Sequence, residues 1–231
     1  MEVKQLILDF VYNQTFDREG FVVAPCNSMA VLWLDRYPNW GSHALLVHGP
    51  KGCGKTHLSH MFGGLHLEAS QLVQGDLPMV DRVVVENIER TIDETALFHL
   101  FNWTKENKIG LLMTAQYLPN FKLPDLASRI MMVPKAVILP PDDELIYAVL
   151  SKAFNERGIS VEPAVLEYAT RYTERTFEAV QALIDMADSL SLAQNRRITI
   201  PIVKQVLNVL RQQRQSQAYM QDDLWEPSLF D

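Results

Sequence analysis

The strongest chemical signal in the chain is a glycine-rich run at residues 49–56, Gly-Pro-Lys-Gly-Cys-Gly-Lys-Thr. It fits the pattern G-x-x-x-x-G-K-[ST], in which the glycines allow backbone N–H groups to converge on phosphate oxygens. In this pattern Lys55 neutralises the β- and γ-phosphate oxygens, and the Thr56 hydroxyl holds Mg²⁺. The run therefore predicts a site for ADP or ATP with Mg²⁺; the alternative is a glycine turn with an exposed lysine. The residues expected to form the site are Gly49, Pro50, Gly52, Cys53, Gly54, Lys55, Thr56 and His57.

A second candidate lies at residues 82–89, Arg-Val-Val-Val-Glu-Asn-Ile-Glu, where an apolar run ends in polar residues. A phosphate-loop protein needs a carboxylate at the end of a neighbouring strand to complete the Mg²⁺ shell, and Glu86 has that position. The next residue normally polarises the attacking water, but Asn87 carries an amide, which makes a poor base. We therefore expect nucleotide binding with weak intrinsic ATPase activity. The alternative for Glu86 is a solvated carboxylate at a strand end.

Both motifs follow apolar runs of strand length, which must place them at one edge of a sheet. Such runs lie at 44–47, 65–67, 82–85, 110–113 and 136–139. Several are apolar at consecutive positions, which is typical of parallel strands covered on both faces, and helical patterns lie between most of them. Residues 16–140 therefore predict an α/β domain with a five-stranded parallel sheet and helices on both faces.

The pattern changes at Pro140-Pro141, after which apolar residues recur only at helical spacing. Residues 141–211 predict a small all-α domain of four helices, with starts near Leu145, Pro163, Phe177 and Thr199. Residues 1–15 are expected to form a flexible leader and residues 212–231 a mobile tail.

Composition narrows the class of protein. The 231 residues include 28 acidic and 21 basic side chains, a net charge of −7, which argues against a dedicated duplex-DNA binder. The two cysteines, Cys26 and Cys53, provide no disulfide framework, and we interpret Cys53 as a small side chain tolerated by the loop rather than a redox group. No signal peptide or membrane span is recognisable, so a cytoplasmic location is expected. The histidines and cysteines show no metal-ligand spacing, so no metal besides Mg²⁺ is expected.

Three further segments carry a resemblance to a known family. With the phosphate loop and the Val-Val-Val-Glu-Asn strand, the α/β-then-helical layout resembles AAA+ ATPases of the DnaA branch. Residues 21–27 (Phe-Val-Val-Ala-Pro-Cys-Asn) resemble that branch's opening segment, and 123–129 (Leu-Pro-Asp-Leu-Ala-Ser-Arg) and 196–204 resemble segments of the Hda family, over roughly 16–211 in all. The resemblance implies contacts to the nucleotide from Val22 and Asn27, a sensor-2 arginine at Arg175 and a sensor-1 residue at Thr114. It also implies an arginine finger at Arg129, which would reach the nucleotide of a neighbouring subunit.

The leader carries a second resemblance. Residues 5–10, Gln-Leu-Ile-Leu-Asp-Phe, are similar to the Q-L-x-L-x-F peptides by which bacterial proteins dock on the β sliding clamp of DNA polymerase III. Gln5, Leu6, Leu8 and Phe10 would then bind the clamp, as an extended segment with apolar anchors can. The alternative is a terminal strand or helix packed on the core.

Together these resemblances imply a negative regulator of DNA replication initiation that docks on the clamp and stimulates ATP hydrolysis by DnaA. Association with the nucleoid or replisome and a homodimer are compatible with it, and sequence-specific DNA binding is not expected. Two alternatives remain open. One is a helicase-loader-like or remodelling ATPase, in which Glu89 would replace the missing base. The other is a DNA- or initiator-tethering adaptor, which would use basic residues of the helical domain.

Overall fold

The structure is a computed structural model that describes residue 18 and residues 21–75 and 78–222, with side chains described up to residue 213. The motif at 5–10, which is predicted to bind the clamp, and the tail from 223 onward lie outside the described residues.

Five parallel strands form one sheet in the order β2-β3-β4-β1-β5. The strands are β1 (Ala44–His48), β2 (Leu65–Glu68), β3 (Arg82–Glu86), β4 (Gly110–Ala115) and β5 (Lys135–Val137). Because all strands are parallel, their carboxyl ends lie at the same edge of the sheet. The predicted five-stranded parallel sheet is confirmed.

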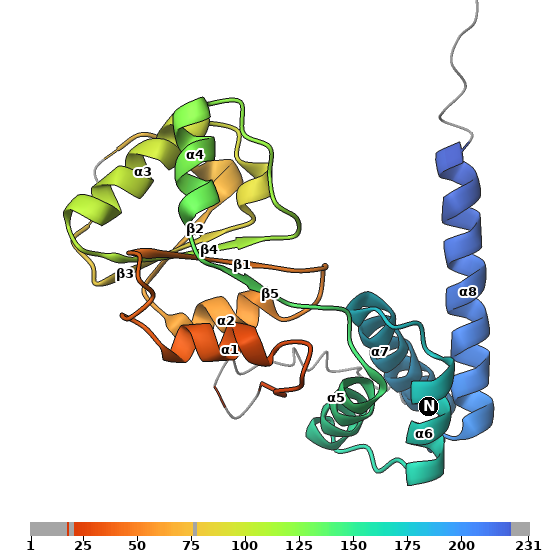
Figure 1. The fold of residues 1–231 in the computed structure, drawn as a ribbon. Coiled ribbons are helices and arrows are strands. Elements are labelled where there is room, and N and C mark those ends of the chain that lie inside the picture. Colours follow the sequence, from red (N-terminus) through yellow and green to blue (C-terminus); the bar gives the residue numbers. More distant parts are fainter. Residues whose placement is uncertain (1–17, 19–20, 76–77, 223–231) are drawn as a thin grey trace, which may run out of the picture.

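Helices cover both faces of this sheet (Figure 1). One face carries α1 (Ser28–Asp35) and α2 (Lys55–Phe62), and the other carries α3 (Glu94–Glu106) and α4 (Pro124–Met132). Alternate strand residues pack toward opposite helices: Leu45 and Val47 join the core under α1 and α2, whereas Leu46 joins the core under α3 and α4. Two short 3₁₀ helices, η1 (Ala69–Gln71) and η2 (Ile88–Arg90), follow β2 and β3.

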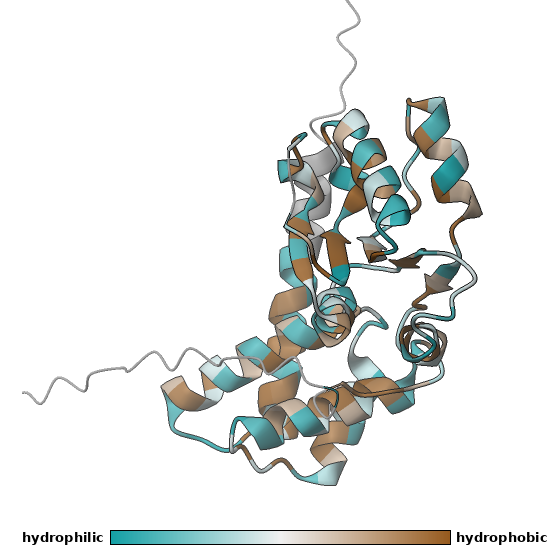
Figure 2. Cartoon of the chain, turned by 90° about the vertical axis from the view of Figure 1, so that its left-hand side faces the viewer, coloured by the Kyte–Doolittle hydropathy of each residue, from teal (hydrophilic) through white to brown (hydrophobic). Residues whose placement is uncertain are grey.

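Four helices after the sheet form a separate lid with its own core. They are α5 (Asp143–Glu156), α6 (Pro163–Tyr172), α7 (Phe177–Gln194) and α8 (Ile200–Asp222). Asp142 and Thr176 cap α5 and α7 by accepting hydrogen bonds from backbone N–H groups, and Pro163 opens α6, where no N–H partner is needed. The helices bury one apolar side each, and Figure 2 shows apolar and polar residues alternating along them. The predicted four-helix lid is confirmed.

The last helix is longer than the sequence pattern indicated. Apolar periodicity fades near residue 211, but α8 continues to Asp222. Residues 212–222 contain no glycine or proline to end a helix, so helical propensity extends α8 beyond its apolar stripe.

No helix among the described residues is long and apolar enough to cross a membrane.

Histidines flank the two ends of β1 and predict a pH dependence of stability. Burial lowers the pKa of His48, and the nearby charges of Lys135 and Lys55 lower it further. Burial also lowers the pKa of His43, whose Nε2 lies 3.2 Å from the Phe101 carbonyl oxygen. Because each folded-state pKa lies below its ordinary value, the unfolded chain binds protons first as the pH falls, and the free energy of unfolding decreases.

We therefore expect the melting temperature to fall between about pH 7.5 and about pH 5.5, across the ordinary histidine pKa. The double variant His43→Gln/His48→Gln should lose less of its melting temperature over this range than the wild type, as measured by circular dichroism. His99→Gln, an exposed histidine on α3, is the matched control. An equal loss in all three proteins would contradict the assignment.

Candidate functional site

The phosphate loop connects β1 to α2 and takes a conformation that depends on two glycines. Gly52 and Gly54 have φ angles of 76° and 91°, in the left-handed region that side chains rarely adopt. A Cβ at Gly54 would also lie 2.8 Å from the Phe21 ring. The glycines therefore allow the loop to turn sharply into the amino terminus of α2, where backbone N–H groups favour an anion.

The Lys55 side chain is buried inside this loop. Its Nζ donates hydrogen bonds to the carbonyl oxygens of Gly49 (2.8 Å) and Pro50 (2.9 Å). It also lies 3.8 Å from the Cys53 Sγ. Burial raises the pKa of the Cys53 thiol more strongly than Lys55 lowers it, so the thiol is protonated and unreactive at neutral pH. The loop thus holds the Lys55 ammonium where phosphate oxygens would bind, and Cys53 lines the loop as an unreactive side chain.

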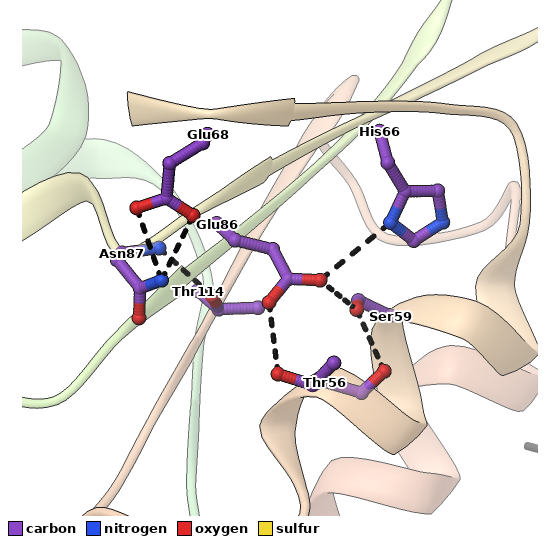
Figure 3. A network of polar contacts seen from close by, with 7 residues as sticks. All are labelled: Thr56, Ser59, His66, Glu68, Glu86, Asn87 and Thr114. Atoms are coloured by element: carbon purple, nitrogen blue, oxygen red, sulfur yellow. Dashed lines mark hydrogen bonds and ion pairs between the residues drawn. The ribbon is translucent and has the colours of Figure 1, made fainter. Parts of the chain in front are cut away.

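The carboxylate of Glu86, at the end of β3, lies against α2 (Figure 3). Its Oε2 accepts a hydrogen bond from the Thr56 hydroxyl at 2.9 Å, and its Oε1 accepts one from Ser59 at 2.7 Å. The His66 Nδ1 lies 3.5 Å from the same Oε1. Hydroxyl and carboxylate oxygens side by side are ligands that Mg²⁺ prefers, so Thr56 and Glu86 fit the predicted metal.

Asn87, the residue after Glu86, is held in the left-handed region at φ 58° and ψ 50°. Its backbone N–H donates to the Thr114 hydroxyl at 3.1 Å, and its amide Nδ2 donates to both carboxylate oxygens of Glu68, at 3.2 and 3.1 Å (Figure 3). The amide is therefore oriented as a donor, and the nearest carboxylate belongs to Glu68 at the end of β2.

In the segment 21–27, which is expected to contact the nucleotide, the Asn27 side chain is hydrogen-bonded to the segment's own backbone. Asn27 is buried; its Oδ1 accepts from the Ala24 N–H at 2.8 Å, and its Nδ2 donates to the Val22 carbonyl at 2.9 Å. The Asn27 side chain thus braces the loop, and the loop backbone holds β5's continuation through a hydrogen bond from Leu139 N to Cys26 O at 2.9 Å. His57, the remaining residue expected in the site, lies edge-on to Phe21, with ring centroids 5.2 Å apart.

The lid contacts the phosphate loop through the start of α7. A Cβ at Gly52 would lie 3.2 Å from the Cβ of Phe177, and Lys51 forms an ion pair with Glu178 at 3.5 Å. Arg175, just before this turn, binds the two carboxylate oxygens of Asp143 at 3.2 and 3.0 Å. The expected contact of Arg175 to a phosphate stays a prediction, and it requires this exposed ion pair to open.

Arg129 lies apart from these residues. It sits near the carboxyl end of α4, with its guanidinium 4.9 Å from the centre of the Phe98 ring. It lines a surface hollow with residues 41–43, which precede β1, whereas the phosphate loop follows the other end of β1. A five-residue strand is about 16 Å long, so Arg129 is at the opposite edge of the sheet from its own phosphate loop.

Sequence reasoning missed four residues that the structure brings to the site. Ser59 lies one helical turn after Thr56, a spacing that could have indicated a shared face. Glu68 and His66 reach it because β2 pairs with β3 in parallel, with Glu68 opposite Glu86. His60, on α2, stacks its ring on His66 with centroids 4.5 Å apart. The strand pairing that places these side chains has no local signal in the sequence.

A parallel sheet in this strand order, with a phosphate loop after β1 and an all-helical lid after β5, defines the AAA+ class of P-loop proteins. The comparisons with known proteins agree. The family model "Hda, lid domain" matches residues 142–207. Domain III of the replication initiator DnaA from Thermotoga maritima superposes with a TM-score of 0.73 at 19% identity, covering 85% of this chain and 97% of that one.

Two sequence relatives extend the match. An uncharacterised protein of Haemophilus influenzae is 29% identical over 186 residues, covering 71% of this chain and 80% of that protein. The initiator DnaA of Lacticaseibacillus casei is 25% identical over 234 aligned residues, covering 85% of this chain and 51% of that protein. The chain thus spans about half the length of the DnaA relatives it matches. It is an AAA+ protein related to Hda and DnaA.

The phosphate loop generates a prediction about nucleotide affinity. Lys55→Ala removes the buried cation and should weaken ADP or ATP binding by at least about tenfold, since a hydrogen bond to a charged group contributes about 1.5–3 kcal/mol. Lys51→Ala, an exposed lysine of the same loop paired with Glu178, should change the affinity by less than about threefold. Titration with a fluorescent nucleotide analogue measures both. Equal losses in the two variants would contradict the assigned role of Lys55.

The hydrogen-bonded pair of Asn87 and Glu68 generates a prediction about ATP turnover. Asn87→Asp alone would oppose two carboxylates about 3 Å apart and raise the pKa of one of them, so little gain in turnover is expected. The double variant Asn87→Asp/Glu68→Gln restores the amide–carboxylate bond with the base at 87. It should raise ATP turnover by about 100-fold, the lower end of general-base effects. Phosphate release by the isolated protein is the readout. Unchanged turnover, or loss of turnover in Glu68→Gln alone, would show that position 87 is not the place for a base.

Proposed function

We propose that this chain is a negative regulator of DNA replication initiation that docks on the β sliding clamp and stimulates ATP hydrolysis by DnaA. The relation of its lid to Hda and of its fold to DnaA supports a regulator that associates with DnaA. An AAA+ protein binds another AAA+ protein by placing an arginine of one at the nucleotide of the other. The initiator's ATP, rather than this chain's own, is then the substrate that matters.

The observation that carries the proposal is the position of Arg129. It lies at the sheet edge opposite its own phosphate loop and, although partly buried, lines an open surface hollow that a neighbouring molecule can enter. A guanidinium is always charged and planar, which suits it to offset charge on a transferring phosphoryl group. These properties support a role for Arg129 as an arginine finger that acts in trans.

The helix that carries Arg129 is fixed at both ends. Before α4, the Glu94 carboxylate accepts hydrogen bonds from the backbone N–H groups of Lys122 (3.1 Å) and Leu123 (2.7 Å). After it, the Lys135 ammonium donates to the carbonyl oxygens of Met131 (2.7 Å) and Val133 (3.1 Å). The Phe98 ring supports the guanidinium itself. Such bracing limits the conformational entropy that Arg129 would lose on entering a partner's site.

The chain's own nucleotide has a supporting role in this proposal. ADP or ATP with Mg²⁺ would bind the phosphate loop, Thr56 and Glu86, with Arg175 from the lid closing on the phosphates. Because Asn87 offers a donor rather than a base, turnover of this nucleotide would be slow. It would then serve to hold the lid against the loop, through Phe177 and Gly52.

Docking on the clamp rests on the sequence motif Gln5–Phe10. An extended peptide of this kind binds with modest affinity, because it loses conformational freedom on binding. The clamp would mainly raise the local concentration of this chain near DnaA on the DNA. A homodimer offers a second neighbour for Arg129, and hydrolysis assays with the isolated protein distinguish it from DnaA.

Arg129→Ala is the direct test. Arginine fingers contribute about 10³–10⁵ in rate, so the variant should reduce stimulation of DnaA hydrolysis, measured with clamp loaded on DNA, to the background rate. Its nucleotide affinity and clamp affinity should not change. The matched control is Arg36→Ala, which should keep full stimulation. It removes an arginine at the end of α1, 5.7 Å from the Trp33 ring, and α1 covers the other face of the sheet. Undiminished stimulation by Arg129→Ala would refute the proposal. Rapid clamp-independent turnover by the isolated wild type would instead favour a self-contained ATPase.

A further inference from the structure

Beside the phosphate loop the structure assembles a group of three metal-ligating side chains, of which the proposed function uses only the carboxylate Glu86. His60 on α2, His66 on β2 and Glu86 at the end of β3 each offer a ligand atom, and these atoms all lie within 4.8 Å of one another. The His60 and His66 rings are nearly parallel, with an angle of 19° and centroids 4.5 Å apart. We infer that these three residues bind a transition-metal dication of the Zn²⁺ type.

The donor set selects the metal. Two imidazole nitrogens and one carboxylate oxygen suit Zn²⁺, whereas Mg²⁺ prefers an all-oxygen shell. Zinc bonds to such ligands are about 2.0–2.2 Å long, so tetrahedral ligand atoms lie about 3.3–3.6 Å apart. His66 Nδ1 and Glu86 Oε1 are already 3.5 Å apart, and no pair of the three atoms needs to approach by more than about 1.5 Å. His60 is exposed on its helix, so its side chain can make this approach without a change in the core. Three protein ligands leave a fourth position for water, which is typical of an exchangeable rather than a structural zinc site.

The two oxygens of Glu86 face different partners, as Figure 3 shows. Oε2 accepts from Thr56, on the side where Mg²⁺ and the nucleotide are expected, and Oε1 lies 3.5 Å from His66 Nδ1. The same carboxylate would thus serve both metals. A Zn²⁺ ion on Oε1 neutralises the charge that attracts Mg²⁺, and two dications a few ångströms apart repel each other. Zinc should therefore weaken binding of the Mg²⁺–nucleotide complex, and the nucleotide should weaken binding of zinc by the same factor.

The first experiment tests the metal site alone, so it is independent of the proposed nucleotide function. The nucleotide-free full-length protein is titrated with Co²⁺, which replaces Zn²⁺ and has visible absorption in tetrahedral sites. The wild type should show this absorption without the sulfur charge-transfer band of a cysteine ligand, and Zn²⁺ should displace it. His60→Gln and His66→Gln should each weaken Co²⁺ binding by at least about tenfold, whereas His99→Gln, on α3, should not. Absence of a tetrahedral signal, or equal Co²⁺ affinity in all four proteins, would overturn the inference.

The second experiment tests the coupling, which rests on nucleotide binding at the phosphate loop. The affinity for a fluorescent ADP analogue with saturating Mg²⁺ is measured with and without buffered Zn²⁺. Zinc should weaken it by about fivefold or more in the wild type and leave it unchanged in His66→Gln. An equal effect in His66→Gln would show that zinc acts on the free nucleotide, and no effect or tighter binding in the wild type would overturn the antagonism. A protein that binds Co²⁺ but no nucleotide would refute the proposed nucleotide role and leave the metal site standing.

Discussion

The interaction on which the site depends is the contact of one carboxylate, Glu86, with the first turns of α2. Its two oxygens accept hydrogen bonds from Thr56 and Ser59, so the helix that follows the phosphate loop is tied to the end of β3. A carboxylate that is only 14% exposed is costly unless it is hydrogen-bonded, and these hydroxyls satisfy it without neutralising it. The negative charge would therefore remain available to a dication, while the buried Lys55 would provide the positive charge for phosphates. The fold keeps opposite charges close together yet directed at different ligands.

The parallel sheet explains why so many polar residues meet at this point. The carboxyl ends of β1, β2, β3 and β4 lie along one edge, and each supplies a residue or a loop to the site: the phosphate loop, Glu68, Glu86 and Thr114. The three central strands β1, β3 and β4 are buried on both faces, so apolar side chains fill their interiors and polar side chains collect toward their ends, whereas the edge strand β2 is only partly buried and carries His66. The lid then completes the enclosure from the adjacent side, because Phe177 fits against Gly52, where a larger side chain would not leave room.

The sequence predicted the parts of this arrangement whose signals are local. The phosphate loop is recognisable because its glycines, lysine and threonine must follow one another, and the strands and lid helices are recognisable from apolar periodicity. The sequence did not predict that Glu68, His60 and His66 lie at the site, because only the parallel pairing of β2 with β3 and the position of α2 bring them to Glu86. Asn27 was expected to contact the nucleotide, but in the structure its amide forms hydrogen bonds to the backbone of its own loop. This loop conformation depends on backbone geometry, which the sequence does not reveal. The length of α8 was underestimated because residues that continue a helix by propensity alone leave no apolar pattern.

The two ends of the sheet have different consequences for how such a protein responds to its nucleotide. The lid contacts the α/β domain at Gly52, near the carboxyl ends of the strands. Arg129 lies near the amino ends of the strands, beside residues that precede β1. A rotation of the lid about this contact therefore does not move Arg129 directly. The connection between the two ends is α4, which follows the strand carrying Thr114 and is held by Glu94 at one end and Lys135 at the other. Both contacts are hydrogen bonds between a charged side chain and backbone groups at the ends of α4, so a shift of the strand ends would move α4 as a whole. Under the proposed function, a partner that recognises the lid and a partner that receives Arg129 would therefore meet separate surfaces, and a nucleotide that closed the lid would act on the first surface only.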